Sequence, residues 1–387
     1  MFSFSTVPRV LSLVIFIAPT LARLQDFGIP PSDATVDVKA FNVANFTLNN
    51  LTSVFLNPVL PGREDFTLPL QAFLIEHKPT KKKFMFDLAM RNDPQNLPPA
   101  FSSFFSSKAI TFDPFKDITE LLQDGGVSLD SIEAVFWSHA HFDHIGDMSK
   151  FPNSTKIVVG GKTDLSLSPE SPNSDLQASD LAGHEVVQLD FANTNLAFAG
   201  MKAIDHFGDG SFYLLDTPGH FTGHMSALAR VTPSSFIVLG GDTHHHVGQF
   251  RPTGAFQDTI PCPGDLLADA RSAISTDFFW STKTTPGAFD IPSRTKPFFA
   301  LSDVPGSFYE DPVTATLTVD KLAAFDADAD FLTIITHDQS IQSILPYFPA
   351  SLSTWQADGL KAKTAWQFVD PANPAFLFSP VQECEFE

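Results

Sequence analysis

Cysteine is scarce in this sequence, because the 387 residues contain only Cys262 and Cys384. Neither belongs to a closely spaced pair of the kind that holds structural zinc. A cysteine-based zinc site is therefore excluded, and any metal ligands must be histidine or carboxylate side chains. In an oxidising compartment the two cysteines can join and fix the C-terminal tail, and two free buried thiols are the alternative.

Basic residues are also few. Lysine and arginine number 24 against 44 aspartates and glutamates, which gives a formal net charge of −20. Nucleic-acid binding relies on a basic face, so this balance argues against a nucleic-acid partner.

Long apolar runs are missing as well. No segment reaches the ~20 apolar residues of a transmembrane helix. An apolar run from Val10 to Ala18 follows Arg9 and precedes a plausible cleavage point at Ala22. Residues 1–22 are therefore predicted to be a signal peptide of a secreted or secretory-pathway protein, and an uncleaved anchor or a folded helix is the alternative. Glycosylation is predicted on the same grounds at Asn-x-Ser/Thr tripeptides that begin at Asn45, Asn50 and Asn153.

Strand and helix patterns alternate along residues 23–387, which predicts one α/β domain. Strands are expected at 72–76, 83–88, 132–137, 156–159, 185–189, 211–215, 225–230, 236–239 and 331–335, of which the first two form a hairpin. Helices are expected at 115–123, at 313–325 and over most of 341–368, where Pro346 and Pro349 are expected to break the helix. Residues 243–312 are rich in Pro, Gly, Phe and Ser, which predicts an insertion that contributes to a substrate wall.

One short run, residues 138–144, holds most of the candidate chemistry. It places His139, His141, Asp143 and His144 within six positions, directly after an expected strand. Imidazole and carboxylate suit zinc and neighbouring divalent metals. The two histidines that are two positions apart project to one side of an extended segment, while the other pair turns toward a second position. The run therefore predicts a site for two ions.

Three later segments each place a candidate ligand just after an apolar strand, namely His220, Asp242 and His337. Together with the first run, this ordered set resembles the metallo-β-lactamase superfamily, whose signature is a His-x-His-x-Asp-His run followed by a His, an Asp and a final His. The resemblance covers roughly residues 70 to 340. It implies an αββα sandwich with the metals at one edge between two sheets.

The resemblance also implies the ligand set and the cofactor. A first metal would be held by His139, His141 and His220, a second by Asp143, His144 and His337, and Asp242 would bridge both. The implied cofactor is two divalent metal ions per chain, expected to be Zn²⁺, which share a hydroxide of lowered pKa as the nucleophile.

Other polar residues are expected to support these ligands. His224 is expected to be structural, because the ligand sets are already complete without it. Asp87 is expected either to orient a ligand or to lie exposed in a turn. Of His244, His245 and His246, at most two can face the metals, because adjacent side chains point in different directions.

The reaction is predicted to be hydrolysis of an ester-like bond in a small, neutral or apolar molecule, with a lactone first. The segment 217–226 looks most like the lactonase and glyoxalase II branches. The alternative hydrolases are a thioesterase, a lactamase and a glyoxalase II. A mononuclear-iron persulfide dioxygenase is the alternative from another reaction class. The non-enzymatic alternative is a binding or scaffold protein that keeps the site only for stability. The sequence makes no prediction of the oligomeric state.

Asp143 and His245 are the predicted catalytic residues. Lactonases of the superfamily commonly place a tyrosine three residues after the bridging aspartate, and this chain has His245 there. The leaving group would then take its proton from His245, from water, or from one of the three tyrosines, Tyr213, Tyr309 and Tyr347.

Overall fold

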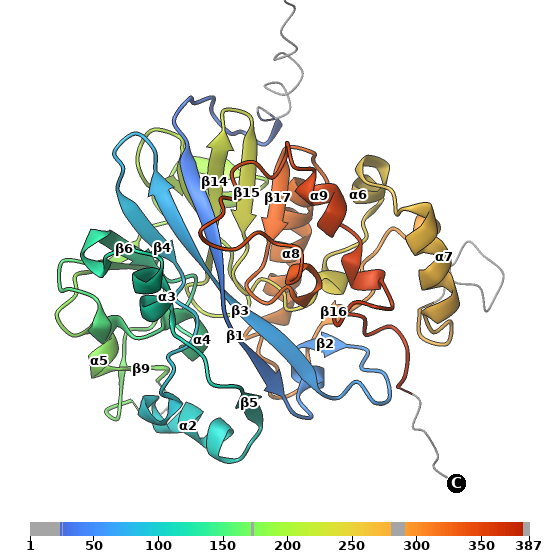
Figure 1. The fold of residues 1–387 in the computed structure, drawn as a ribbon, viewed down its shortest axis with the longest axis horizontal. Helices are drawn as coiled ribbons and strands as arrows, with labels where there is room; N and C mark the ends of the chain where they lie inside the picture. Colours follow the sequence, from blue (N-terminus) through green and yellow to red (C-terminus); the bar gives the residue numbers. More distant parts are fainter. Residues whose placement is uncertain (1–23, 25, 172–173, 280–290, 382–387) are drawn as a thin grey trace, which may run out of the picture.

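A seven-stranded mixed sheet forms one layer of the protein (Figure 1). The computed structural model describes residues 24, 26–171, 174–279 and 291–381, so the predicted signal peptide and Cys384 lie outside it. The strand order is β10 (Val186–Leu189), β7 (Lys156–Gly160), β6 (Ile132–Phe136), β4 (Lys83–Phe86), β3 (Phe66–His77), β1 (Val36–Leu48) and β5 (Ile110–Phe112). The pairs from β4 to β10 are parallel, and the β3–β4 hairpin is confirmed as antiparallel.

A six-stranded sheet forms the second layer. Its order is β11 (Leu196–Phe198), β12 (Met201–Asp205), β13 (Phe212–Asp216), β14 (Met225–Thr232), β15 (Ser235–Leu239) and β17 (Phe331–Ile334). Only the β15–β17 pair of this sheet is parallel. Two short pairs accompany the sheets, β2 (Leu56–Asn57) with β16 (Ala300–Leu301), and β8 (Leu167–Ser168) with β9 (Leu176–Gln177).

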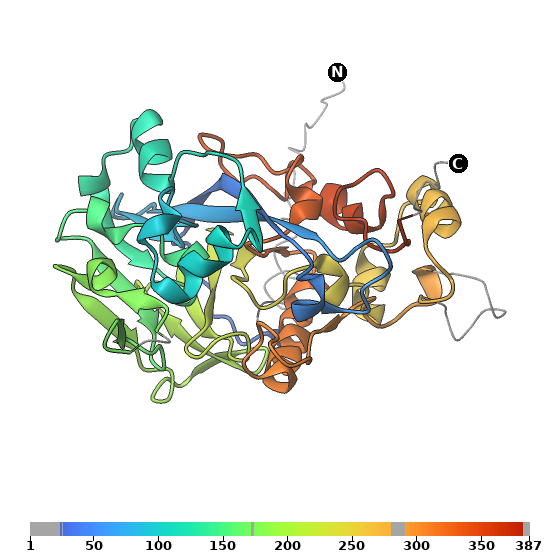
Figure 2. The ribbon, with the colours of Figure 1, turned by 90° about the horizontal axis from the view of Figure 1, so that it is seen from below.

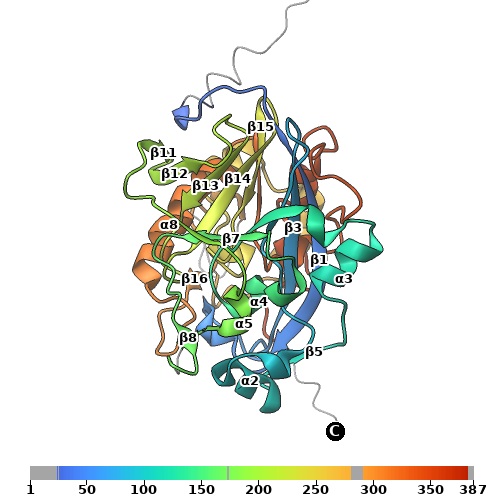
Figure 3. The same cartoon turned by 90° about the vertical axis from the view of Figure 1, so that its left-hand side faces the viewer.

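The two sheets pack face to face through a buried apolar layer. Phe136 of the first sheet meets Phe212 of the second with ring centroids 5.4 Å apart. Helix α3 (Ile118–Asp124) and helix α8 (Pro312–Asp326) lie on opposite outer sides of the pair of sheets (Figure 3). The predicted αββα sandwich is therefore confirmed. Because both faces of the central strands are buried, their sequences are almost continuously apolar.

Helices α3 and α8 begin at residues that cap them. Asp117 accepts hydrogen bonds from the N–H groups of Thr119 and Glu120, and the Glu120 side chain accepts one from Asp117 in return. Asp311 accepts from the Thr314 N–H, and Pro312 occupies the first turn of α8. These side chains satisfy the free N–H groups at each helix start. Other α-helices in the described residues are α2 (Pro99–Ser106), α4 (Phe142–Ile145), α5 (Ala178–Leu181), α6 (Gly254–Thr259), α7 (Gly264–Ala273) and α9 (Leu360–Thr364).

In the described part of the predicted insertion, residues 243–279 and 291–312, helices α6 and α7 project at one end of the molecule (Figure 2). Phenylalanines of the insertion pack together with the C-terminal segment, as in the stacked pair Phe299 and Phe378, with centroids 4.9 Å apart. None of the helices in the described ranges has the length and apolar character of a membrane span.

The helix expected over most of 341–368 is wrong. Within this range the structure has only the end of a 3₁₀ turn (Gln339–Ile341), helix α9 and the start of the 3₁₀ turn Gln367–Val369. Pro346 and Pro349 lack an N–H group. The N–H groups of Phe348 and Leu352 instead donate to the carbonyls of Ala40 and Val38 on β1. Pairing with β1 therefore replaces helical hydrogen bonds here.

Candidate metal centre

The seven predicted ligands meet where strands of both sheets end. His139 and His141 follow β6, and Asp143 and His144 lie in the one-turn helix α4 just beyond. His220, Asp242 and His337 follow β13, β15 and β17 respectively. All are buried except His141, which is partly exposed. The side-chain atoms form two adjacent groups that share Asp242.

The first group consists of three imidazoles and Asp242. His139 Nε2 lies 2.8 Å from His141 Nδ1, and His220 Nε2 lies 3.1 Å from each of these atoms. Asp242 Oδ2 is 3.6 Å from His220 Nε2. Burial lowers the pKa of His139 and of His220 well below the usual value, and it lowers the pKa of His141 to about 4. The rings are thus neutral, which is the form that binds metals.

The second group contains two carboxylates that face two imidazoles. Asp242 Oδ2 lies 3.1 Å from His337 Nε2 and 3.2 Å from His144 Nε2. Asp143 Oδ2 is 3.4 Å from His337 Nε2. Burial on its own would lower the pKa of His337, but the carboxylates of Asp242 and Asp143 raise it to about 9. This group therefore favours a positive charge at its centre.

The hydrogen bonds that these residues make, and those that they lack, indicate a metal site. His144 Nε2 and Asp242 Oδ1 are buried and have no hydrogen-bond partner among the described residues. A polar atom buried in this way costs about 1–3 kcal/mol. Three imidazole nitrogens that lie within 3.1 Å of one another cannot all be satisfied by the protons of neutral rings. A cation that accepts their lone pairs satisfies them together, as in histidine and carboxylate sites for zinc.

Residues around the two groups fix which ring nitrogen faces inward. Asp87 is fully buried, and its Oδ2 accepts a hydrogen bond from His144 Nδ1 at 2.9 Å while its Oδ1 accepts from the Ser138 N–H at 2.7 Å. His337 Nδ1 donates to the Pro69 carbonyl at 2.9 Å. The Nε2 atoms of both rings are thereby left free to bind a metal. Of the two expectations for Asp87, the structure shows the orienting contact.

His224 supports Asp242 and is not part of either group. Its Nε2 accepts a hydrogen bond from the Asp242 N–H at 3.0 Å, and its Nδ1 donates to the Thr217 carbonyl at 2.9 Å. Both ring nitrogens are therefore engaged with the backbone, which agrees with the structural role expected from the sequence.

Only the middle one of the three consecutive histidines faces the centre. His244 stacks on Phe250, and His246 bonds the Ala375 carbonyl through Nε2. His245 Nε2 lies 3.2 Å from Asp242 Oδ2, and its ring stacks on His337 with centroids 5.4 Å apart.

Tyr309 is the tyrosine that reaches this centre. Its hydroxyl lies 2.8 Å from His245 Nδ1. Tyr213 packs on Phe198 instead, and the Tyr347 hydroxyl has no hydrogen-bond partner among the described residues. The sequence alone left all three tyrosines open, because no spacing rule connects residues 245 and 309.

The loop of residues 302–311 connects the pocket wall to a candidate ligand. The Phe308 N–H donates to the Val54 carbonyl, and the N–H groups of Glu310 and Asp311 donate to the carbonyls of His220 and Gly219. Phe308 stacks on Phe55 with ring centroids 4.8 Å apart and planes inclined by 10°. The same loop thus shapes the cavity and holds the backbone of His220.

A small cavity of about 20 Å³ adjoins the two groups. Its polar lining consists of His141, Asp143, His220, Asp242, His245 and His337, and its apolar lining consists of Phe46, Leu48, Phe55, Leu68, Ile110, Phe142 and Phe308. No lysine or arginine is present among the described residues that line it. The apolar wall from β1, β3 and β5 was not identified from the sequence, because it depends on how distant strands pair.

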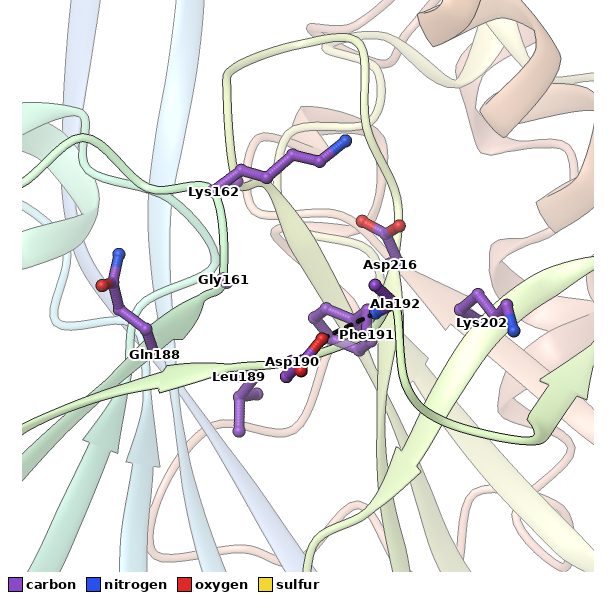
Figure 4. A pocket seen from close by; sticks show the side chains of 11 residues that line it. Gly161, Lys162, Gln188, Leu189, Asp190, Phe191, Ala192, Lys202 and Asp216 are labelled. Carbon is purple, nitrogen blue, oxygen red and sulfur yellow. Dashed lines mark hydrogen bonds between the residues drawn. The ribbon is translucent and has the colours of Figure 1, made fainter.

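A second cavity, of about 350 Å³, borders the loop that carries His220 (Figure 4). Its polar side chains include Lys162, Gln188, Asp190, Lys202 and Asp216. None of the seven predicted ligands lines it. The metal chemistry therefore belongs to the smaller cavity.

The sequence of this chain is similar to one protein family and to several known proteins. Residues 69–253 match the model of the metallo-beta-lactamase superfamily. The chain is 35% identical over 360 residues to gamma-lactamase FDB1 of Fusarium pseudograminearum, covering 89% of this chain and 84% of that protein. It is 35% identical over 353 residues to cytochrome P450 monooxygenase mpaDE' of Penicillium brevicompactum, covering 88% of this chain but only 38% of that protein.

A solved structure from work on "Indirect contributions of mutations underlie optimization of new enzyme function" has the same fold. It aligns with a TM-score of 0.50 and 18% identity, covering 82% of this chain and 98% of that chain.

Proposed function

This chain belongs to the metallo-β-lactamase superfamily, and on that premise we propose that it is a dinuclear metal-dependent hydrolase that opens a neutral lactone. Membership of the superfamily supports a metal-dependent hydrolase. The type of bond that is cleaved and the number of metal ions are what we propose. The observation that carries the proposal is the position of Asp242 Oδ2, which lies within 3.6 Å of Nε2 atoms from both groups of histidines. An oxygen in that position can bridge two cations.

In this proposal the seven residues keep the roles expected from the sequence. The first ion would be held by His139, His141 and His220, the second by Asp143, His144 and His337, and Asp242 would contribute to both sites. Bound divalent ions, for which Zn²⁺ is the proposed identity, supply a water of lowered pKa and polarise an acyl carbonyl. Metal analysis separates this from the iron-dependent alternative, since about two zinc per chain is expected and one iron would contradict it.

His245 is the proposed proton donor to the leaving oxygen. Its ring lines the small cavity, and its Nε2 lies 3.2 Å from Asp242 Oδ2, so a substrate acyl group placed beside Asp242 comes within reach. Asp143 lines the same cavity, where its proposed role is to hold the second ion. Protonation of the leaving atom by a positioned side chain contributes typically about 10²–10⁴-fold to a hydrolysis rate.

The cavity favours a neutral substrate with an apolar group. Its wall is formed by aromatic and aliphatic side chains, and no cationic side chain is present among the described lining residues. A substrate with carboxylates, such as a glutathione thioester, would have to lose its hydration there without a charge partner. The second candidate is a cyclic amide, which is favoured by the name of the relative FDB1, a gamma-lactamase.

The test is turnover of matched lactone, lactam and thioester panels by zinc-loaded protein. We expect lactone opening, and we expect His141→Ala and Asp242→Ala each to lose more than about 100-fold in kcat/KM. His206→Ala is the matched control, because His206 packs against Phe136 and Phe84 and belongs to neither group. Activity equal to wild type in the two ligand variants would contradict the proposal.

A further inference from the structure

We propose that Tyr309 is a positioning residue that holds His245 in the tautomer with its proton on Nε2. This inference rests on the proposed function, in which His245 acts as a donor to the substrate. The two residues belong to different segments of the insertion, and nothing in their spacing connects them. The inference is carried by the hydrogen bonds around them.

Tyr309 is fixed beside His245 in a buried position. Only 2% of its surface is exposed, its hydroxyl lies 2.8 Å from His245 Nδ1, and the two rings are inclined by 83°. The loop around it is anchored on both sides, through the Phe308 N–H to Val54 and through the Glu310 N–H to His220. Because hydrogen bonds hold the backbone on both sides of Tyr309, its side chain is held beside His245.

The direction of the hydrogen bond follows from the neighbouring Gln249. Its Oε1 already accepts the N–H groups of His245 and His246, at 2.8 Å and 3.0 Å. Its Nε2 donates to the Phe55 carbonyl at 2.8 Å. The amide oxygen has two lone pairs, so both are used. Gln249, which also contacts the Tyr309 side chain, therefore has no free acceptor for its proton. Among the described residues, the acceptor within hydrogen-bond distance of the Tyr309 hydroxyl is His245 Nδ1, at 2.8 Å.

The phenol carries its proton at neutral pH, because the ordinary pKa of a tyrosine hydroxyl is about 10. A neutral imidazole carries one proton, so an Nδ1 that accepts from Tyr309 leaves that proton on Nε2. This Nε2 is the atom that lies 3.2 Å from Asp242 Oδ2 beside the cavity.

The consequence is that His245 presents an N–H group and not a lone pair. In the opposite tautomer Nε2 would offer a lone pair at 3.2 Å from the shared carboxylate oxygen, where it would compete as an additional metal ligand. By keeping the proton of His245 on Nε2, Tyr309 makes this ring a hydrogen-bond donor, whereas the surrounding histidines present lone pairs that can bind a metal. Removal of the hydroxyl should let the ring change from donor to ligand.

The tautomer can be measured without any substrate. We would record the side-chain ¹⁵N signals of histidine-labelled, zinc-loaded protein and assign His245 by comparison with His245→Gln. The expected result is a protonated Nε2 and an unprotonated Nδ1 in the wild type, and a changed His245 pattern in Tyr309→Phe. A protonated Nδ1 in the wild type, or an unchanged pattern in Tyr309→Phe, would overturn the inference.

Tyr347→Phe is the matched control, because the Tyr347 hydroxyl has no hydrogen-bond partner among the described residues and Tyr347 does not line the cavity. It should leave the His245 signals and the kinetics unchanged. For Tyr309→Phe we expect kcat to fall about tenfold while KM stays within about twofold, since the substrate still binds but the donor is misplaced. An unchanged kcat would overturn the inference.

The two proposals can fail separately. A protein that shows the Nε2–H tautomer and its dependence on Tyr309 but opens no lactone supports this inference while contradicting the proposed substrate. A lactonase in which His245 carries its proton on Nδ1 contradicts this inference alone.

Discussion

Single residues that bind no metal themselves decide which nitrogen atoms face the centre. Asp87 lies just after β4 with a left-handed backbone, at a φ of 57°, and its carboxylate bonds both the Ser138 N–H and His144 Nδ1. The Pro69 carbonyl holds His337 in the same manner. Such partners fix the ring orientation and the tautomer of a ligand. The ligand set therefore depends on side chains and carbonyls outside it.

Asp87→Asn tests this dependence. The single oxygen of the amide stays with the Ser138 N–H, so its NH₂ group faces His144 Nδ1. His144 then carries its proton on Nε2 and loses the lone pair that faces Asp242. We expect the zinc affinity of the second group to fall about 10–100-fold, measured by competition with a chelator.

Asp209→Asn is the control for that change. Asp209 Oδ2 lies 2.8 Å from His77 Nε2, so the variant alters an aspartate–histidine pair that does not belong to the centre. Its zinc affinity should equal that of the wild type. The same affinity in Asp87→Asn and wild type would show that Asp87 does not orient His144 for metal binding.

The seven candidate ligands could be predicted from the sequence because each follows an apolar strand or lies in the turn just after one. These side chains come together because the ends of the strands that precede them lie side by side. Tyr309 could not be predicted, because its contact with His245 depends on the path of the loop 302–311 and not on any periodicity.

At the level of elements, the turn that carries His220 is packed too tightly to admit a larger residue. Gly219 has a φ of 125°, and a Cβ there would lie 2.1 Å from the Ala315 nitrogen at the start of α8. At Gly223 a Cβ would lie 2.4 Å from the Thr163 nitrogen. Helix α8 and the turn after β7 thus hold this loop from both sides.

Gly219→Ala should therefore displace the loop and His220 with it. The clash is with backbone atoms, so we expect a loss of several kcal/mol, more than the roughly 1–3 kcal/mol of a strained backbone alone, and a lower zinc content. Thermal unfolding and metal analysis measure the two effects. Gly306→Ala is the control, because Gly306 also has a positive φ, of 85°, but nothing lies within 4 Å of its Cβ position. Equal losses of stability in the two variants would contradict the role assigned to the clash.

Elements with uninterrupted patterns were predictable, and elements that depend on partners were not. Helix α8 and strands β6, β14, β15 and β17 lie where their apolar patterns indicate. Strand β1 (Val36–Leu48) was missed, since a register shift between Asn42 and Ala44 interrupts its alternation. The segment 341–368 has apolar residues at helical spacing, but its N–H groups pair with β1.

For the molecule as a whole, a buried ion pair ties the start of the insertion to the end of α8. Arg251 Nε and Nη2 donate to Asp326 Oδ2 and Oδ1, both at 2.7 Å, and both side chains are buried. Burial alone would raise the pKa of Asp326, but the Arg251 guanidinium lowers it by a larger amount. The pKa of Asp326 therefore lies below its ordinary value of 3.8. The pair therefore contributes stability above about pH 4, which is lost as the pH falls through the lowered pKa.

Arg251→Met should destabilise the protein in a pH-dependent manner. The carboxylate of Asp326 loses its partner, so its folded pKa rises above 3.8 and the variant loses stability as the pH rises from about 4. At pH 7 we expect a loss of about 3–5 kcal/mol in the free energy of unfolding, measured with urea, and a smaller loss near pH 4.5.

Lys82→Ala is the control, because the pair of Lys82 with Glu133 at 2.9 Å is about half exposed. Its removal should cost less than about 1 kcal/mol. A loss in Arg251→Met that is the same at both pH values would contradict the assigned cause.

The sandwich itself could be predicted from the order of the four metal-ligand motifs, since each one marks the end of a strand. The limits of the domain, the signal peptide at residues 1–22, the glycosylation of Asn45, Asn50 and Asn153, and the Cys262–Cys384 bond remain predictions. The three asparagines are exposed in the structure, as a glycosylation site requires.

The loop 302–311 bears on how an enzyme of this kind can diversify. Because one loop supplies Phe308 to the cavity and also bonds the backbone of His220, a duplicated gene that exchanged this loop would alter substrate range and metal affinity in one step. Phe46, Leu48 and Ile110 line the cavity from strands β1 and β5 without this link. We expect new substrate ranges to arise first through those three positions, while the loop changes late in a lineage.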